Sequence, residues 1–156
     1  DNGYPHHAPG TTSPRRATLR KVDLGWADLR EAAMGWADLC KANLRGADLR
    51  GAIGLPEAPV VPNIDAAILA AIRTQGCSLK MNRWHSCETT HCRAGWAIHL
   101  AGEAGYTLER ATTPYLAGRL IYEASRPGVP CPDFFASDLE ALADLAQCAT
   151  AFGASC

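Results

Sequence analysis

Residues 17–51 read ATLRK VDLGW ADLRE AAMGW ADLCK ANLRG ADLRG, which divides into seven consecutive units of five residues. Each unit has a small residue first, usually Asp or Asn second, and Leu or Met third. A period of five fits neither an alternating strand nor an α-helix with about 3.6 residues per turn. It fits a backbone that turns a corner after each unit, with small residues at the crowded corners and leucine at the centre. The repeat therefore predicts a solenoid of stacked coils.

These units resemble the pentapeptide-repeat family, whose pattern is A(D/N)LXX. The resemblance implies a right-handed, quadrilateral β-helix with four units in each coil. Residues 17–56, which include the decayed unit AIGLP, would then form about two coils. Because a solenoid needs caps over its apolar ends, we expect the rest of the chain to cover one end. The N-terminal tail, residues 1–16, or another subunit would cover the other.

The remaining residues predict a short linker and a helical domain. Three prolines (Pro56, Pro59 and Pro62) end the repeat and indicate an extended linker over residues 57–62. Four helices are expected in the helical domain, residues 63–156. The first runs from the N-cap Asn63 to Gly76, and the second from Thr89 or Thr90 to Gly102–Gly105. The third starts at Thr113 with Pro114 at its first position, and the fourth starts at Ser137 with Glu140 in a capping box. The predicted fold is therefore mixed, a short β-solenoid capped by a small helical domain.

The helical part carries a resemblance of its own. Residues 63–147, with WHSCETTHCRAGW, HLAGEAG, LIYEAS and DFFASDLEALAD, resemble a region attached to pentapeptide repeats in bacterial and phage proteins. That region has no assigned activity, so the resemblance supports the architecture and implies no chemistry.

Charge and hydropathy argue against several classes of partner. The net charge of −1 gives no overall attraction to nucleic acid or to an anionic membrane. The longest apolar run, Ala66–Ile72, is too short to span a bilayer. Some pentapeptide-repeat proteins mimic DNA and protect topoisomerases, but residues 17–56 carry six basic against five acidic side chains. Mimicry of DNA is therefore disfavoured, and the outward arginines are expected to pair with nearby aspartates.

The stretch WHSCETTHCRAGW, residues 84–96, contains the candidate site residues. His85, Cys87, His91 and Cys92 are the residue types that bind zinc, with His99 or Cys131 as a further ligand. A nucleophilic Cys92 at a helix N-terminus, with His85 or His91 as base, is a second hypothesis. A Cys87–Cys92 disulfide is a third. The sequence favours a fourth, a packing joint, because Cys92, Trp96 and His99 fall on one helix face.

Two further expectations concern the compartment and the ends of the chain. Seven cysteines without regular spacing favour a reducing compartment, the cytoplasm, over an extracellular location or a virion assembly. Because the chain begins at Asp1 and both methionines are internal, we expect a processed or trimmed piece. Trp26 and Trp36, two units apart, are expected to be packing anchors on opposite sides of a coil.

Together these features predict a non-enzymatic structural or interaction module without a cofactor. It is expected to assemble with itself, as a homo-oligomer, or with a protein partner through the β-helix, and to bind neither nucleic acid nor membrane. The alternative is a zinc- or thiol-dependent protein that uses the four-residue Cys/His cluster. Protection of topoisomerases is the least favoured of the three.

Overall fold

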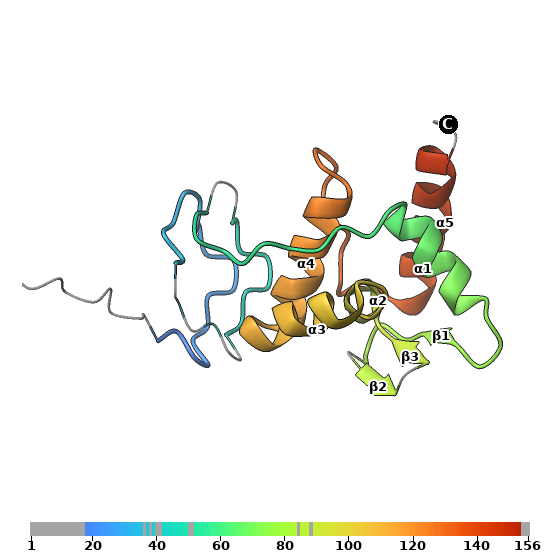
Figure 1. Ribbon diagram of the computed structural model, residues 1–156, viewed down its shortest axis with the longest axis horizontal. Coiled ribbons are helices and arrows are strands. Elements are labelled where there is room, and N and C mark those ends of the chain that lie inside the picture. The colour runs from blue at the N-terminus through green and yellow to red at the C-terminus, as the bar shows by residue number, and fades with distance from the viewer. Residues whose placement is uncertain are drawn as a thin grey trace, which may run out of the picture.

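The computed structural model describes residues 18–35, 37, 39, 42–49, 52–83, 85–87 and 89–153, with backbone only at 85–87 and 152–153. The repeat segment lies at one end of the molecule and the helices at the other (Figure 1). The helices are α1 (Ile64–Ile72), α2 (Arg93–Leu100), α3 (Gly102–Ala111), α4 (Pro114–Ser125) and α5 (Asp138–Gly153). The strands are β1 (Ser78–Leu79), β2 (His85–Cys87) and β3 (Thr90–His91), in the order β1-β3-β2.

The repeat segment is built in two stacked layers, which we call the first layer (residues 18–35) and the second layer (the described residues of 37–53). Parallel β-bridges join residues that are 20 positions apart: Asp23–Asn43, Asp28–Asp48 and Ala33–Ile53. The backbone N–H of Leu24 donates to Asn43 O at 2.8 Å, and Asn43 N–H donates back to Val22 O at 2.9 Å. Four five-residue units therefore separate each residue from the one stacked on it.

The corners between units are tight turns. The N–H of the first residue in a unit donates to the carbonyl of the residue three positions earlier, as Ala27 does to Leu24 and Ala47 to Leu44, both at 3.1 Å. Lys21, Trp26 and Glu31, each the third residue of such a turn, have φ of 60°, 60° and 58°. This left-handed backbone normally favours glycine, so three large side chains occupy corners at a conformational cost.

The leucines of the third positions are not equally buried. Three leucines of the second layer are 1–5% exposed (Leu39, Leu44 and Leu49), whereas three in the first layer are only half-buried (Leu19, Leu24 and Leu29). The cause is α4, whose Leu116 is fully buried in the same apolar cluster. Helix α4 therefore caps the second layer.

Two polar or cationic contacts reinforce this joint. Arg119 of α4 donates a hydrogen bond to the backbone oxygen of Ala47 in the second layer. The Arg45 guanidinium lies 4.3 Å from the ring centroid of Phe135, which precedes α5. The prediction that the helical residues cover one end of the repeat is thus matched by these contacts. Residues 1–17, in which the predicted tail falls, lie outside the described structure.

Two helix starts agree with their sequence signals. Thr113 Oγ1 accepts the N–H of Leu116 at 3.1 Å, and Pro114 opens α4. Ser137 and Glu140 form the expected capping box, since Ser137 N–H donates to Glu140 Oε2 at 2.9 Å and Glu140 N–H to Ser137 Oγ at 3.3 Å. In both cases a hydroxyl satisfies an N–H that has no partner within the helix.

Asn63 is the N-cap of α1, as predicted, but its backbone is left-handed, with φ 49° and ψ 47°, and its side chain makes no capping hydrogen bond. The predicted start of the second helix is wrong. Thr90 lies in β3, and α2 begins only at Arg93, where Cys92 Sγ accepts the Gly95 N–H at 3.4 Å. Strand β3 pairs with β1 and β2 in a small sheet just before α2 begins. Strands of two or three residues are too short to be recognised in the sequence.

The predicted second helix is in fact two helices. Helix α2 ends at Leu100, and Gly102 with φ 62° redirects the chain into α3. The described part of the chain therefore holds five helices rather than the four expected. Helices α2 and α4 cross closely, since a Cβ on Gly118 would lie 2.6 Å from Ala94 Cβ.

Trp26, which the sequence predicted to be a packing anchor, packs on one face only. Its ring lies directly against Gly46 of the second layer, but 78% of the residue is exposed. Trp36 lies outside the described residues. Because a side chain on Gly46 would overlap the ring, this glycine is required by Trp26 as well as by its own φ of 67°.

Replacement of Gly54 by alanine tests how closely the residue that follows the second layer approaches the first layer. A Cβ at Gly54, where φ is 77°, would lie 2.5 Å from Gly35 Cα, whereas Gly76, with φ 85°, has open space around it. We expect Gly76→Ala to cost about 1 kcal/mol of unfolding free energy, from the positive φ alone, and Gly54→Ala about 3 kcal/mol or more. Urea denaturation measures both, and equal losses would contradict the close approach.

Candidate functional site

The backbone of the Cys/His stretch forms the small sheet and the start of α2. His85 of β2 pairs with His91 of β3 in the antiparallel register, and Thr90 pairs with Cys87 across a β-bulge. The side chains of His85 and Cys87 lie outside the described residues. The structure therefore places the side chains of only His91 and Cys92 from the predicted metal set.

His91 belongs to a buried aromatic stack. Its ring lies 4.9 Å from that of His99, nearly parallel at 28°, and 4.7 Å from that of Trp96, edge-on. His99 Nδ1 hydrogen-bonds to Tyr106 Oη at 2.8 Å, and the Trp96 indole N–H donates to Ser78 O at 3.1 Å. Stacked imidazole rings present their faces to one another rather than their nitrogen lone pairs, so this geometry favours packing.

Cys92 is the N-cap of α2 and is 1% exposed. The hypothesis of a nucleophile assumed that the helix N-terminus lowers its pKa. Burial instead raises the pKa of Cys92, and the hydrogen bonds from the backbone N–H groups of Gly95 and Ala94 offset this only in part. The expected lowering is therefore wrong, because exclusion of water penalises the thiolate more than the backbone dipoles favour it.

The zinc and disulfide hypotheses stay predictions. Among the described residues, no group of three or more His, Cys, Asp and Glu side chains is arranged to hold a metal ion. Because the other half of the four-residue set and the Cys87 thiol lie outside that description, neither hypothesis is tested. The packing interpretation has direct support, since residues 91–98 are all buried.

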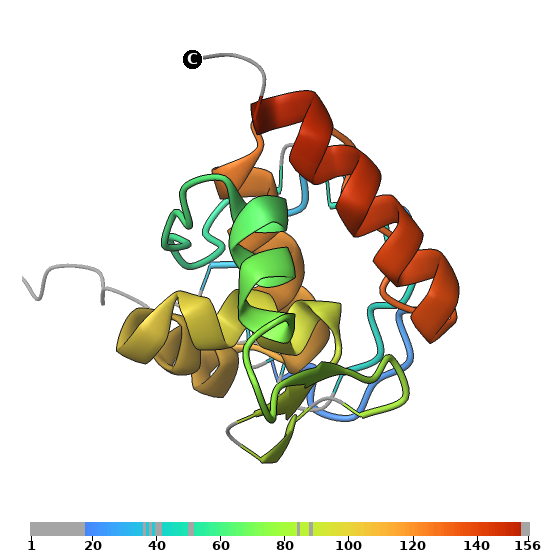
Figure 2. The ribbon, with the colours of Figure 1, turned by 90° about the vertical axis from the view of Figure 1, so that its right-hand side faces the viewer.

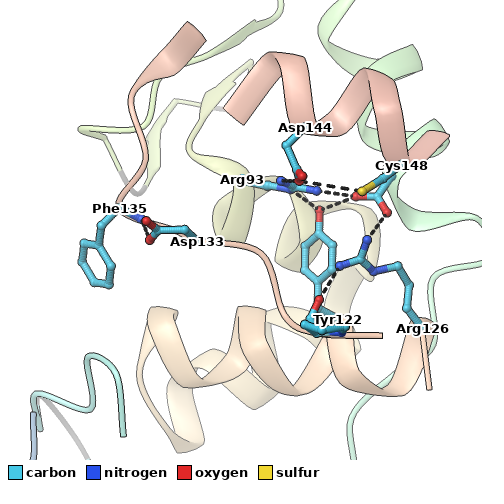
Figure 3. A network of polar contacts seen from close by, with 9 residues as sticks. Arg93, Tyr122, Arg126, Asp133, Phe135, Asp144 and Cys148 are labelled. Atoms are coloured by element: carbon cyan, nitrogen blue, oxygen red, sulfur yellow. Dashed lines mark hydrogen bonds and ion pairs between the residues drawn. The ribbon is translucent and has the colours of Figure 1, made fainter. Parts of the chain in front are cut away.

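A buried ionic network, which the sequence did not reveal, lies next to this motif (Figure 3). Arg93, 1% exposed, donates to Asp65 Oδ1 at 2.7 Å and to Tyr122 Oη at 2.8 Å, and it pairs with Asp144 of α5. Arg126, 7% exposed, donates to Asp65 Oδ2 at 2.7 Å. The network thus joins α1, α2, α4 and α5 around one carboxylate.

Two guanidinium groups of this network face two carboxylates, those of Asp65 and Asp144. Asp65 is buried with both arginines, whereas the Asp144 side chain is 50% exposed, so Asp144 neutralises the remaining positive charge from the solvent side. Burial alone would lower the pKa of Arg93, but Tyr122, Asp144 and Asp65 together raise it above its ordinary value. Desolvation raises the pKa of Tyr122, so the phenol stays protonated and donates to Asp65 Oδ1 at 3.2 Å.

A cavity of about 430 Å³ lies beside the network, between α5 and the loop that follows α4. Its walls include both arginines, two thiols (Cys131 and Cys148) and three acidic side chains (Asp133, Glu140 and Asp144). Burial raises the pKa of Cys131 to about 12, so this thiol is protonated at neutral pH. The arginines are already neutralised by aspartates, and the arrangement is suited to holding four helices together rather than to activating a substrate.

The sequence does not reveal this network because its members are far apart in the chain. Asp65 lies in the first turn of α1 and Arg93 is the first residue of α2, and no local pattern links the two positions. One signal was available: on an α-helix Arg93 lies between residues expected in the core, and Asp65 follows Ile64 in an otherwise apolar stretch. Charged residues at such positions are rarely buried unless they are paired.

The outer surface of the repeat is polar and internally paired. Arg30 binds Asp28 through two hydrogen bonds, of 2.8 and 2.5 Å, and lies 3.8 Å from Asp48. Asn43 donates to Asp23 at 2.9 Å. For these side chains the prediction of a solvated, paired face is confirmed, and this part of the surface has little charge to offer a polyanion.

Comparisons with known proteins bear on the repeat alone. The family model described as pentapeptide repeats matches residues 17–53, in eight copies. Neither the comparison with curated proteins nor that with solved structures finds a match. The resemblance noted for residues 63–147 stays a prediction. Among the described helices, none has the length and apolar character needed to cross a membrane.

Removal of Asp65 tests the buried network. Asp65→Asn would leave two buried guanidinium groups facing a single carboxylate, and we expect a loss of about 3–5 kcal/mol in unfolding free energy. The matched control is Glu103→Gln, which breaks an exposed pair with Arg110 and should leave the unfolding free energy nearly unchanged. Similar losses in the two variants, measured by urea denaturation, would show that the network is not structural.

Alkylation of the native protein tests the thiols. At pH 8 a thiol with a pKa of about 12 is ionised in about one molecule in ten thousand. We expect iodoacetamide to modify Cys92 and Cys131 at least a hundredfold more slowly in the native protein than in urea, as read by mass spectrometry of peptides. Rapid native labelling of Cys92 would revive the nucleophile hypothesis.

Proposed function

Because residues 17–53 are a pentapeptide-repeat segment, we propose that the protein is a non-enzymatic structural module that assembles with a second copy through the outer side of its first layer. In this proposal the repeat is a two-coil, right-handed quadrilateral β-helix, and the helical domain is the cap on its second coil. Proteins built from such repeats are generally non-catalytic, which agrees with a role in assembly.

The difference in burial between the two layers carries the proposal. Leu44 is 1% exposed under α4, whereas Leu24, which occupies the same position 20 residues earlier, is only half-buried. The described residues leave the outer side of the first layer open. A solenoid end of this kind needs a cap, because its leucines are otherwise in contact with water. A second copy, applied end to end, would supply leucines of the same spacing.

The backbone of the first layer supports the same surface. In a parallel ladder, alternate residues direct their N–H and C=O groups to opposite sides. Leu24 N–H and Val22 C=O bond to the second layer, so the peptide groups of Asp23, which lies between them, point the other way. The same holds for Ala33, because Met34 N–H and Ala32 C=O bond to the second layer. Such an edge is a template for pairing with another chain. The low net charge of −1 adds little long-range repulsion between copies.

Sedimentation velocity of Leu24→Asp tests the proposal. A carboxylate at this half-buried position would be desolvated in the interface, so we expect the dissociation constant to rise at least tenfold. The control Val60→Asp places the same charge on a linker residue that is 61% exposed, and it should leave association unchanged.

Two results would contradict the proposed assembly. One is a wild-type protein that stays monomeric at high concentration. The other is a Leu24→Asp variant that loses stability with no change in mass, which would mean that the chain's own residues cover the first layer.

A further inference from the structure

Helix α5 has a second apolar stripe, which faces solvent. Leu139 is 78% exposed and Leu142 is 42% exposed, and Ala143 and Ala146 are exposed as well. These four residues stand at i, i+3, i+4 and i+7, which places them on one face of the helix. The opposite face is already used, because Ala141 and Leu145 are buried in the body of the protein. A surface helix normally has a polar outer face, so this stripe calls for a partner.

A groove runs beside the stripe. Figure 2 shows α1 and α5 next to each other on the end of the molecule that faces the viewer. A cavity of about 630 Å³ lies between these helices and β1, with apolar walls made by Leu69, Ile72, Leu79, Leu139, Leu142 and Ala146. Charged side chains (Arg73, Lys80 and Asp138) line the same cavity, but none belongs to the stripe. An exposed leucine next to an apolar hollow is a surface that can fit a copy of itself.

The residue sizes along the stripe indicate which way a partner would lie. We consider two antiparallel copies of α5 that are related by a twofold axis between positions 142 and 143. In this arrangement the numbers of two facing residues add up to 285. Leu139 then faces Ala146 of the second copy, and Leu142 faces its Ala143. Each large side chain meets a small one, as close packing between helices requires. A parallel arrangement would instead place leucine against leucine and alanine against alanine.

We propose that the stripe of α5, formed by Leu139, Leu142, Ala143 and Ala146, is a second self-association surface on which two copies pack their α5 helices antiparallel. This surface lies at the opposite end of the molecule from the repeat segment (Figure 1). It is therefore independent of the proposed contact between first layers. Two twofold contacts at opposite ends of one chain join each molecule to two others, which builds an extended row unless the two axes meet and close a ring.

A size swap across the predicted register tests the proposal. Leu139→Ala leaves a gap opposite Ala146, and Ala146→Leu sets two leucines against each other, so we expect each single variant to weaken association at least tenfold. The double variant Leu139→Ala/Ala146→Leu restores one large and one small residue at each contact. Its dissociation constant should return to within about threefold of the parent value. Ala151→Leu adds the same bulk to α5 outside the stripe and should change nothing.

Sedimentation velocity is measured in the wild-type chain and in the Leu24→Asp background, where only the α5 contact would remain. Circular dichroism confirms that each variant is folded. A double variant that is no better than the single variants overturns the antiparallel register. A folded Leu24→Asp protein that is strictly monomeric, when the wild type associates, overturns the α5 contact and leaves the first-layer proposal intact. Association that survives Leu24→Asp and responds to the size swap supports the α5 contact. The first-layer contact is overturned if the dissociation constant of Leu24→Asp equals that of the wild type.

Discussion

The burial of the second-layer leucines by α4 is the contact on which the architecture depends. Two layers of a solenoid cannot enclose their own core, because every leucine lies near an end. Leu116 enters the apolar cluster of the repeat and is itself fully buried, while Arg119 holds the backbone of the second layer. The same helix carries Tyr122 and leads into Arg126, so the joint with the repeat and the buried ionic network share one rigid element.

This arrangement explains why the helical domain is tied together by charges as well as by apolar contacts. Helix α4 must be held firmly if it is to act as a cap, and Asp65 links it to α1 and α2 through Arg93 and Arg126. Buried ion pairs contribute little net stability compared with apolar packing, yet loss of one member is costly. The geometry allows few alternative packings of these helices, because each guanidinium group needs its carboxylate within hydrogen-bonding distance.

The sequence was most informative where one chemical pattern recurs. Seven units in register predicted the stacked layers, and hydroxyl caps at Thr113 and Ser137 predicted two helix starts. The small sheet escaped prediction because strands of two or three residues carry no periodicity. The Asp65–Arg93 pair escaped because its members are 28 positions apart (93 − 65). Cys92 was recognised as a helix-start residue, but burial, which decides its pKa, depends on side chains from distant segments. Exposure of Leu139 likewise could not be inferred, because the same spacing would suit a buried face.

The central claim is that the outer side of the first layer is a contact surface. Hydrogen exchange, followed by mass spectrometry as the protein concentration is raised from below to above the dissociation constant, tests this most directly. The claim predicts that backbone amides of residues 18–35, including those of Asp23 and Ala33, exchange more slowly as copies associate, while the linker around Val60 does not change. Exchange in residues 18–35 that is independent of concentration, in a protein that associates, would contradict it.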